Sequence, residues 1–399
     1  MISSSEVKAN PSIWLFFCLA VCSGLGVANV YYLQPGLSLI QNEFGVSPDA
    51  AGWLAAATQI CYGLGMLLLA PLGDILPRRK LVTVKAILLL AALTMAASAH
   101  SFMLLVIASM VVGLLGSIGQ DFIPIAAQLA PDNKRGHLVG IVTTGLLTGI
   151  LLSRTLGGWI SQLLGWREMQ YLASFLMLIV LVIVRFMLPE QRHTGEHQKY
   201  SRLMSSLWTL WRTHRVLRIS VMTQACLGAT LGAFWSCLAF VLTAEPFHFG
   251  PAVAGSFGIA GAAGALAAPV FGKYTDRKGP LPVIRFGCIL VILSFVGLLA
   301  LPPSIWALIV GAVLFDLGAQ AGLVSHQIIV TGIGQDSRSR TNGLLMTGAM
   351  VGMALGAVMG SLLWSHAGST GLFSFAAVAG LLAFGISFGH SRTKPTLSA

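Results

Sequence analysis

The sequence predicts an all-α membrane protein of twelve transmembrane helices, arranged as two six-helix halves related by pseudo-two-fold symmetry. Of the 399 residues, 56% are hydrophobic and only 9% are charged, whereas soluble globular chains carry roughly 25% charged residues. The apolar residues gather in long segments. In addition, a short charged motif occurs twice, around Asp74 and again around Asp276, each time between two apolar segments.

Most of these apolar segments reach the roughly 20 residues that cross a bilayer as a helix. In chain order they are 13–40, 50–70, 81–99, 102–130, 138–164, 169–188, 217–243, 251–270, 281–301, 304–332, 341–365 and 370–389. The first segment is too long for a signal peptide and eleven more follow it, so we expect it to be a retained helix.

The 24 Lys and Arg residues, which give a net charge of +11, lie mostly in alternate connections between the segments. The other connections hold acidic residues and one base, Arg167. Cytoplasmic loops carry the excess of bases, so both termini are expected in the cytoplasm, as parts of a multi-pass membrane protein. The basic charge therefore indicates orientation, and no nucleic-acid partner is expected.

The six cysteines lie inside apolar segments and form no C-x-x-C pair, so we expect neither a metal site nor a disulfide framework. The sequence has no Gly-x-x-x-x-Gly-Lys-Ser/Thr phosphate loop, which argues against an ATP-driven pump. We therefore expect no cofactor, no catalytic residues and no enzymatic activity.

The chain carries an internal repeat. A stripe of small residues recurs at an offset of 203 positions: Gly145, Gly149, Ser153 and Gly157 correspond to Gly348, Gly352, Gly356 and Gly360. A four-residue step places such residues on one helix face, either for static close packing or as a surface on which two halves rock. The predicted domains are 1–188, a cytoplasmic linker with an amphipathic helix at 189–216, and 217–399.

Twelve segments in two sixes with a charged motif after the second and eighth resemble the major facilitator superfamily. Its signature, Gly-x-x-x-Asp-Arg/Lys-x-Gly-Arg-Arg/Lys, is matched in part by Asp74, Arg78 and Arg79, and by Gly272, Asp276, Arg277 and Gly279. Within this family the chain resembles bacterial drug and metabolite efflux proteins of the proton-antiport type. It differs from them in having Ser109 in place of an Arg and Arg154 within the fifth segment. It resembles more closely an uncharacterised bacterial subgroup with an Arg in the fifth helix and an Asp in the tenth, and this resemblance implies a location in the bacterial inner membrane.

The resemblance implies a monomeric secondary transporter whose partners are a small-molecule substrate, protons and the lipid bilayer. Proton-coupled efflux of amphipathic molecules or metabolites by alternating access is the expected function. The alternatives are uptake by proton symport, facilitated diffusion of a metabolite, and a membrane sensor without transport activity. The resemblance also implies a cytoplasmic gate, in which Asp74, held by Arg78, faces the helix N-terminus near Thr341. The expected gate residues are Asp74, Arg78, Arg79, Asp276 and Arg277.

Few ionisable side chains lie within the segments, and each requires an explanation. Arg154 and Asp316 are at matching depths near the bilayer midplane. We expect Asp316 to exchange a proton under the influence of Arg154, or the two to form a permanent ion pair. His326 is either a proton relay or a structural hydrogen-bond partner. Asp121 either gates the cytoplasmic exit or bonds a polar neighbour, and Lys85 is expected to snorkel.

Polar and aromatic side chains also gather on the segments that line the central path in the family fold. They suit amphipathic or aromatic cargo, although some of them are expected only to bridge helices. The expected substrate-cavity residues are Asn29, Tyr32, Gln34, Gln59, Tyr62, Gln120, Gln224, Trp235, Gln320 and Gln327.

Overall fold

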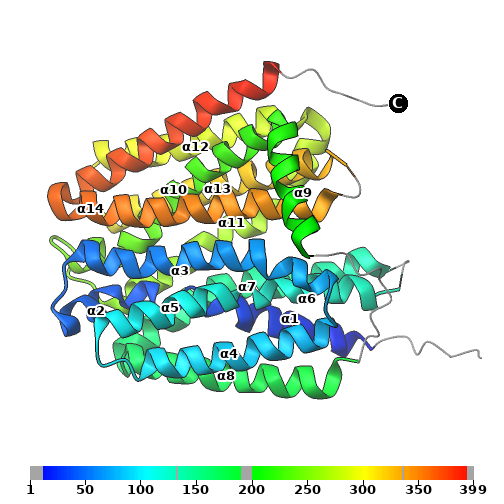
Figure 1. Cartoon of the computed structure of the whole chain (residues 1–399). Coiled ribbons are helices and arrows are strands. Elements are labelled where there is room, and N and C mark those ends of the chain that lie inside the picture. Colours follow the sequence, from blue (N-terminus) through cyan, green and yellow to red (C-terminus); the bar gives the residue numbers. More distant parts are fainter. Residues whose placement is uncertain (1–11, 132–133, 190–199, 335–336, 393–399) are drawn as a thin grey trace, which may run out of the picture.

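The computed structural model describes residues 12–131, 134–189, 200–334 and 337–392, and this part of the chain contains helices and no strand. The predicted linker therefore lies partly outside the described residues. Figure 1 shows two bundles of roughly parallel and antiparallel helices, with the first half of the chain below the second.

Within the described residues, the elements of the first half include eight α-helices and the short 3-10 turns η1 and η2. They are α1 (Ile13–Ala28), η1 (Gln34–Gly36), α2 (Leu37–Phe44), α3 (Pro48–Leu68), η2 (Ala70–Asp74), α4 (Arg78–Ala97), α5 (Phe102–Gly116), α6 (Ile118–Leu129), α7 (Arg135–Leu163) and α8 (Trp166–Met187).

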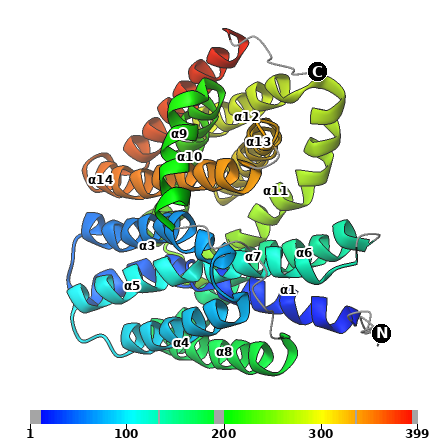
Figure 2. The same cartoon turned by 45° about the vertical axis from the view of Figure 1, so that its right-hand side comes forward.

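A short connecting helix, α9 (Tyr200–Thr213), precedes the second half. The elements of the second half are α10 (Arg215–Thr243), α11 (Pro251–Lys278), α12 (Pro280–Ala300), α13 (Ile305–Thr331), α14 (Arg338–Ser387) and η5 (Phe388–Arg392). In Figures 1 and 2, α9 lies beside the second bundle and reaches towards the first.

Several predicted segments differ from the observed helices, and the segment predicted at 102–130 is divided at Ser117 into α5 and α6. The segment predicted at 13–40 is interrupted, because Pro35 has no N–H to donate and α1 has already ended at Ala28. In contrast, α14 contains both of the last two predicted segments. Gly368, at a φ of 56°, breaks its helical geometry, and this left-handed conformation favours glycine.

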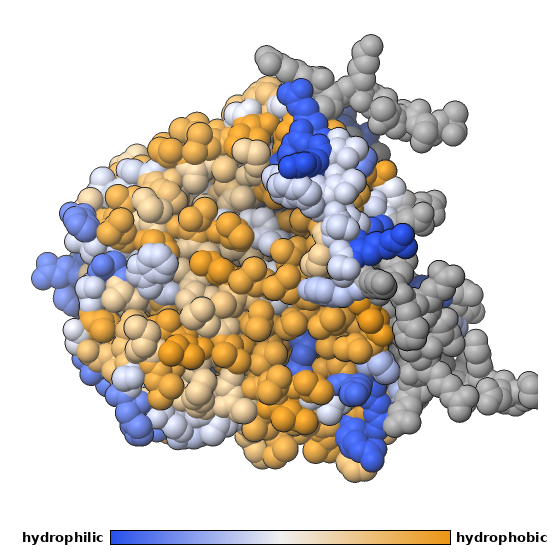
Figure 3. Space-filling model, in the orientation of Figure 1, coloured by the Kyte–Doolittle hydropathy of each residue, from blue (hydrophilic) through white to orange (hydrophobic). Residues whose placement is uncertain are grey.

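The lengths of the helices agree with a twelve-helix membrane fold. Nine helices in the described residues are long and apolar enough to cross a membrane. One of these covers both spans of α14, while α1 and α11 supply shorter apolar helices. Figure 3 shows the corresponding surface, a broad apolar belt between two more polar ends.

The two stripes of small residues pack inside the halves. A Cβ on Gly149 of α7 would collide with the backbone of Gly24 in α1, and a Cβ on Gly352 of α14 would collide with the backbone of Ala225 in α10. The stripes therefore serve static close packing, and the same α1–α7 arrangement recurs as α10–α14.

Other surfaces join the halves. Gly158 of α7 approaches Gly255 of α11, and Gly52 of α3 approaches Ser361 of α14. Beside the first contact, the Oε1 atom of Gln162 accepts a hydrogen bond from the Ala252 N–H at 2.9 Å. These contacts lie at the end of the molecule opposite α9, where the halves are closely joined.

The end that carries α9, here called the linker end, is hollowed. A cavity of about 360 Å³ lies there between the end of α3, the start of α4, α6, α9 and the start of α14. Met204 and Leu207 of α9 contribute to its wall, and the Tyr200 hydroxyl donates to the Leu68 carbonyl at 3.0 Å. Thus α9 connects the two halves across the cavity.

Candidate functional site

Arg154 lies deep in the protein, where α7 meets the second half, and its exposure is only 6%. The guanidinium carbon is 4.7 Å from the ring centre of Tyr31 and 4.3 Å from that of Trp235, so aromatic rings flank it. Its Nε donates to Gln34 Oε1 at 3.3 Å. Desolvated cation–π contacts are worth ~2 kcal/mol or more, so these contacts hold the buried cation in place.

Asp316 of α13 also lies close to Trp235. Its Oδ2 atom is 2.8 Å from the position that a Cβ on Gly261 would occupy, and Trp235 Cζ2 is 3.2 Å from the same position. The guanidinium of Arg154 thus lies over the indole face, while the carboxylate of Asp316 lies near the indole edge.

The expected permanent ion pair between Arg154 and Asp316 is not formed. Within the described residues, no ion pair closer than 4.0 Å involves either side chain. As their matching predicted depths suggest, the two residues lie at one site. Both lie close to the indole of Trp235, which comes from α10, a third helix.

A half-buried polar face leads from Asp316 along α13. Gln320 and Gln327 are, like Asp316, half-buried, and their spacing places them on the same helix face towards the linker end. The main contacts of α13 are with helices of its own half, namely α10, α11, α12 and α14.

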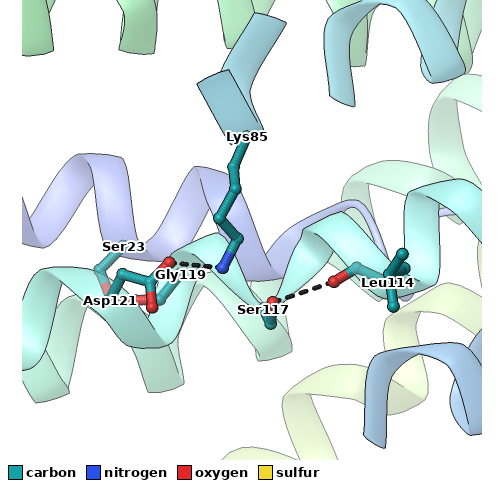
Figure 4. A network of polar contacts seen from close by, with 6 residues as sticks. All are labelled: Ser23, Lys85, Leu114, Ser117, Gly119 and Asp121. Carbon is teal, nitrogen blue, oxygen red and sulfur yellow. Dashed lines mark hydrogen bonds and ion pairs between the residues drawn. The ribbon is translucent and has the colours of Figure 1, made fainter. Parts of the chain in front are cut away.

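Asp121 has a different partner from those expected. Lys85 Nζ lies 2.5 Å from Asp121 Oδ2, and the two side chains are 3% and 10% exposed. Figure 4 shows Lys85 reaching from α4 to α6, close to the bond from the Ser23 hydroxyl to the Gly119 carbonyl, which is 2.7 Å long. The prediction that Lys85 snorkels is wrong, because Lys85 lies on the buried face of α4.

Sequence reasoning therefore missed Lys85 as a site residue, although a signal was present. Leu81, Lys85 and Leu89 recur at a four-residue spacing and are all buried. A lysine on the apolar face of a helix, rather than on its polar face, indicates a buried partner. Tyr31 was also left out of the cavity list in favour of its neighbour Tyr32.

His326 makes the structural hydrogen bond that was one of its two expected roles. Its Nδ1 lies 3.1 Å from Gln224 Oε1, and both side chains are buried in the second half. The ring of His390 is 5.9 Å away, and His390 Nε2 lies 3.0 Å from the Ser220 hydroxyl. Gln224 is thus occupied by His326 in this conformation.

The remaining cavity candidates lie in several environments. The Asn29 amide donates to the carbonyls of Leu25 and Gly26 in its own helix and also faces Met177 of α8, so it points into the first half. This corrects the expectation that Asn29 lines the central path.

Other candidates bridge helices or lie enclosed. Gln120 donates to the Tyr62 hydroxyl at 3.3 Å, which joins α6 to α3. Gln327 approaches the Met346 sulfur at 4.0 Å. Gln59 is 1% exposed, and neither of its amide atoms has a partner in the described chain. Tyr32 is buried beside the α1–α7 groove.

The expected gate residues lie at the linker end. Arg78 lines the cavity there together with Asp121 and Arg340, which brings side chains from both halves to one space. Arg79 donates to the Arg185 carbonyl at 2.6 Å on the outside of the first half, and Arg277 is exposed. The side chains of Asp74 and Asp276 lie outside the described ones.

Comparisons with known proteins agree with this architecture. A family model described as Major Facilitator Superfamily matches residues 16–304 and 225–398. The uncharacterised transporter YgaY of Escherichia coli O157:H7 is 33% identical over 358 residues, which cover 90% of this chain and 91% of YgaY. The probable transporter SCO4007 of Streptomyces coelicolor is 31% identical over 324 residues, which cover 81% of this chain and 73% of that protein.

A solved structure shares the fold. It is a bacterial homologue of the human lysosomal transporter Spinster in an inward-facing and unoccupied conformation, with a TM-score of 0.78 and 14% identity over 99% of this chain and 100% of that one. Because the family model and the relatives match nearly the full length, the chain belongs to the Major Facilitator Superfamily of membrane transporters.

Proposed function

We propose that the chain is a proton-coupled secondary transporter that exports small amphipathic molecules or metabolites by alternating access. The observation that carries this proposal is the placement of Arg154 and Asp316. They belong to different halves, are expected in the membrane interior, and both lie close to Trp235 without forming an ion pair closer than 4.0 Å within the described residues. An ionisable pair divided between two moving bodies is sensitive to their relative position.

Asp316 is the proton carrier in this proposal. Its half-buried face continues through Gln320 and Gln327 to the linker end, which gives protons and substrate a route from that side. When the halves rock and the guanidinium of Arg154 approaches, the positive charge favours the ionised carboxylate, and Asp316 releases its proton. Conformation and proton occupancy are thereby coupled.

The moving bodies are the predicted halves, 1–188 and 217–399, with α9 as the strap between them. The bases at the linker end orient that end towards the cytoplasm of the bacterial inner membrane, with both termini on that side. Asp74 with Arg78, and Asp276 with Arg277, form the latch that closes it. In this proposal Asp121 acts near the cytoplasmic exit, and His326 stabilises the second half through its hydrogen bond with Gln224. The protein works as a monomer.

Transport by reconstituted protein tests this proposal. Cells that overexpress the chain are first grown against a panel of toxic amphiphiles and toxic metabolite analogues, and a compound to which they become resistant is chosen. Proteoliposomes with an internal pH dye then compare wild type with Asp316→Asn, Arg154→Ala and the exposed control Arg202→Gln.

The wild type and the control are expected to move protons against the compound, while both site variants lose gradient-driven flux. Unchanged gradient-driven flux in both site variants would contradict the proposed proton coupling. Accumulation of the compound inside cells, in place of its exclusion, would instead identify uptake by symport.

A further inference from the structure

The charges at the central site carry information about the substrate itself. The guanidinium of Arg154 contacts the rings of Tyr31 and Trp235, and its Nε donates to Gln34. Its terminal nitrogens, Nη1 and Nη2, make no hydrogen bond to any described residue. They form a planar fork of donors, which is the geometry that matches a carboxylate.

Asp316 offers the opposite charge. Its carboxylate has no Lys, Arg or His within 4.0 Å in the described chain, and its side chain remains half-buried. The Trp235 side chain hydrogen-bonds this carboxyl, but a buried carboxylate is stabilised further when a cation binds it. The site therefore presents a cationic group and an anionic group that belong to no ion pair closer than 4.0 Å within the described residues.

This arrangement discriminates among ligands by their charge. A simple cation is repelled by Arg154, and a simple anion is repelled by Asp316. A neutral molecule leaves both charges unmatched. A ligand with one charge of each sign satisfies both walls at once, and specificity of this kind uses repulsion as well as attraction.

We propose that the substrate is a small zwitterion, whose carboxylate binds Arg154 and whose ammonium group binds Asp316, with its apolar part against the rings of Tyr31 and Trp235. This inference rests on the proposed transport site. It also gives that site an exchange step: the ammonium group and the proton compete for the Asp316 carboxylate, so binding one releases the other.

Equilibrium binding by the full-length protein in detergent tests the proposal without a pH gradient. The readout is the shift in thermal unfolding on adding four matched classes of compound. These are the twenty standard α-amino acids, the amines that lack the carboxylate, the acids that lack the amine, and the neutral amides of those acids. A shift is expected with one or more zwitterions and with no member of the other classes.

Variants then assign the two ends of the ligand. Arg154→Gln and Asp316→Asn are each expected to weaken binding of the zwitterion by roughly 30-fold or more, as the loss of one partner of a buried charge pair does. In Asp316→Asn, binding also becomes independent of pH between about 5 and 8, a change that a merely structural role would not produce. Arg202→Gln keeps the wild-type affinity and pH dependence.

The result that overturns the proposal is stabilisation by amines, acids or amides alone, or by none of the four classes. If zwitterions fail to bind while Asp316→Asn still loses gradient-driven flux of another compound, the substrate class is wrong and the proposed function stands. If zwitterions bind but no proton moves with them, coupling is wrong and the substrate class stands.

Discussion

Lys85 Nζ and Asp121 Oδ2 lie 2.5 Å apart in the interior of the first half, and both side chains are almost enclosed by α1, α4 and α6. The pair lies beside the linker-end cavity, of which Asp121 forms part of the wall. Each charge is tolerated there because the other is present. The pair therefore ties α4 to α6 within a single half.

Removing one member of this pair is expected to destabilise the protein strongly. Asp121→Asn leaves the ammonium of Lys85 buried without a counter-charge, which typically costs ~3–5 kcal/mol. Thermal unfolding in detergent measures the effect. The double variant Lys85→Met with Asp121→Leu is expected to recover most of the loss, and an Asp121→Asn protein as stable as wild type would contradict the interpretation.

The glycine stripe of α14 is expected to be intolerant of even one methyl group. In Gly352→Ala the new Cβ meets the Ala225 backbone of α10, and such overpacking typically costs ~1–3 kcal/mol. Gly385→Ala, in the same helix, is the matched control, because a Cβ there meets nothing within 4 Å. Equal unfolding temperatures for the two variants would show that α10 and α14 are not packed this closely.

Trp235 is expected to matter for transport more than for folding. In Trp235→Ala both residues lose the indole that each of them contacts, so Arg154 and Asp316 are expected to close into an ion pair that holds the halves in one state. Transport should fall at least tenfold, whereas Trp235→Phe retains a ring and part of the activity. The lipid-exposed control Trp306→Ala, at 73% exposure, keeps full activity. Wild-type transport by Trp235→Ala would refute this role.

A pH effect on stability is expected at the end opposite α9, outside the membrane-spanning segments. Burial raises the pKa of the Glu43 carboxyl, but hydrogen bonds from Arg167 and from Trp166 Nε1, the latter 2.6 Å long, outweigh it, so the pKa is lowered. Folding therefore favours ionised Glu43. Its contribution is present above the unfolded value of about 4.3 and is lost as the pH falls through the folded pKa.

The Glu43→Gln variant checks this sign. Its unfolding temperature should lie below that of wild type at pH 7, and the difference should shrink as the pH falls below about 4. The corresponding loss in the free energy of unfolding is expected to stay under about 1 kcal/mol, because the Glu43 side chain is 41% exposed and solvent screens the pair. A difference that grows on acidification would contradict the assignment.

The helices and the internal repeat could be predicted from the sequence because they depend on local patterns. Apolar length located the spans, and the spacing of Gly145, Gly149, Gly352 and Gly356 indicated close packing. Which helix those glycines pack against could not be predicted, since α1 and α10 are brought to them only by the tertiary fold.

The site was predictable in depth but not in contacts. Counting residues from the helix ends placed Arg154 and Asp316 at one level. The position of Trp235 beside them depends on how α10 is rotated, and a side chain of α10 cannot be oriented from depth alone. Lys85 was misassigned for a related reason, because distance from a helix end was weighed above the face of the helix on which it lies.

The measurement that tests the central claim most directly is gradient-driven transport by Asp316→Asn compared with exchange in the absence of a gradient. An amide cannot carry the proton, yet at a substrate concentration high enough to offset the weakened binding the site is still occupied and can reorient. The variant should therefore lose pH-driven accumulation in proteoliposomes while it retains substrate exchange at equal pH. Accumulation at the wild-type rate would contradict the assignment of Asp316 as the proton carrier.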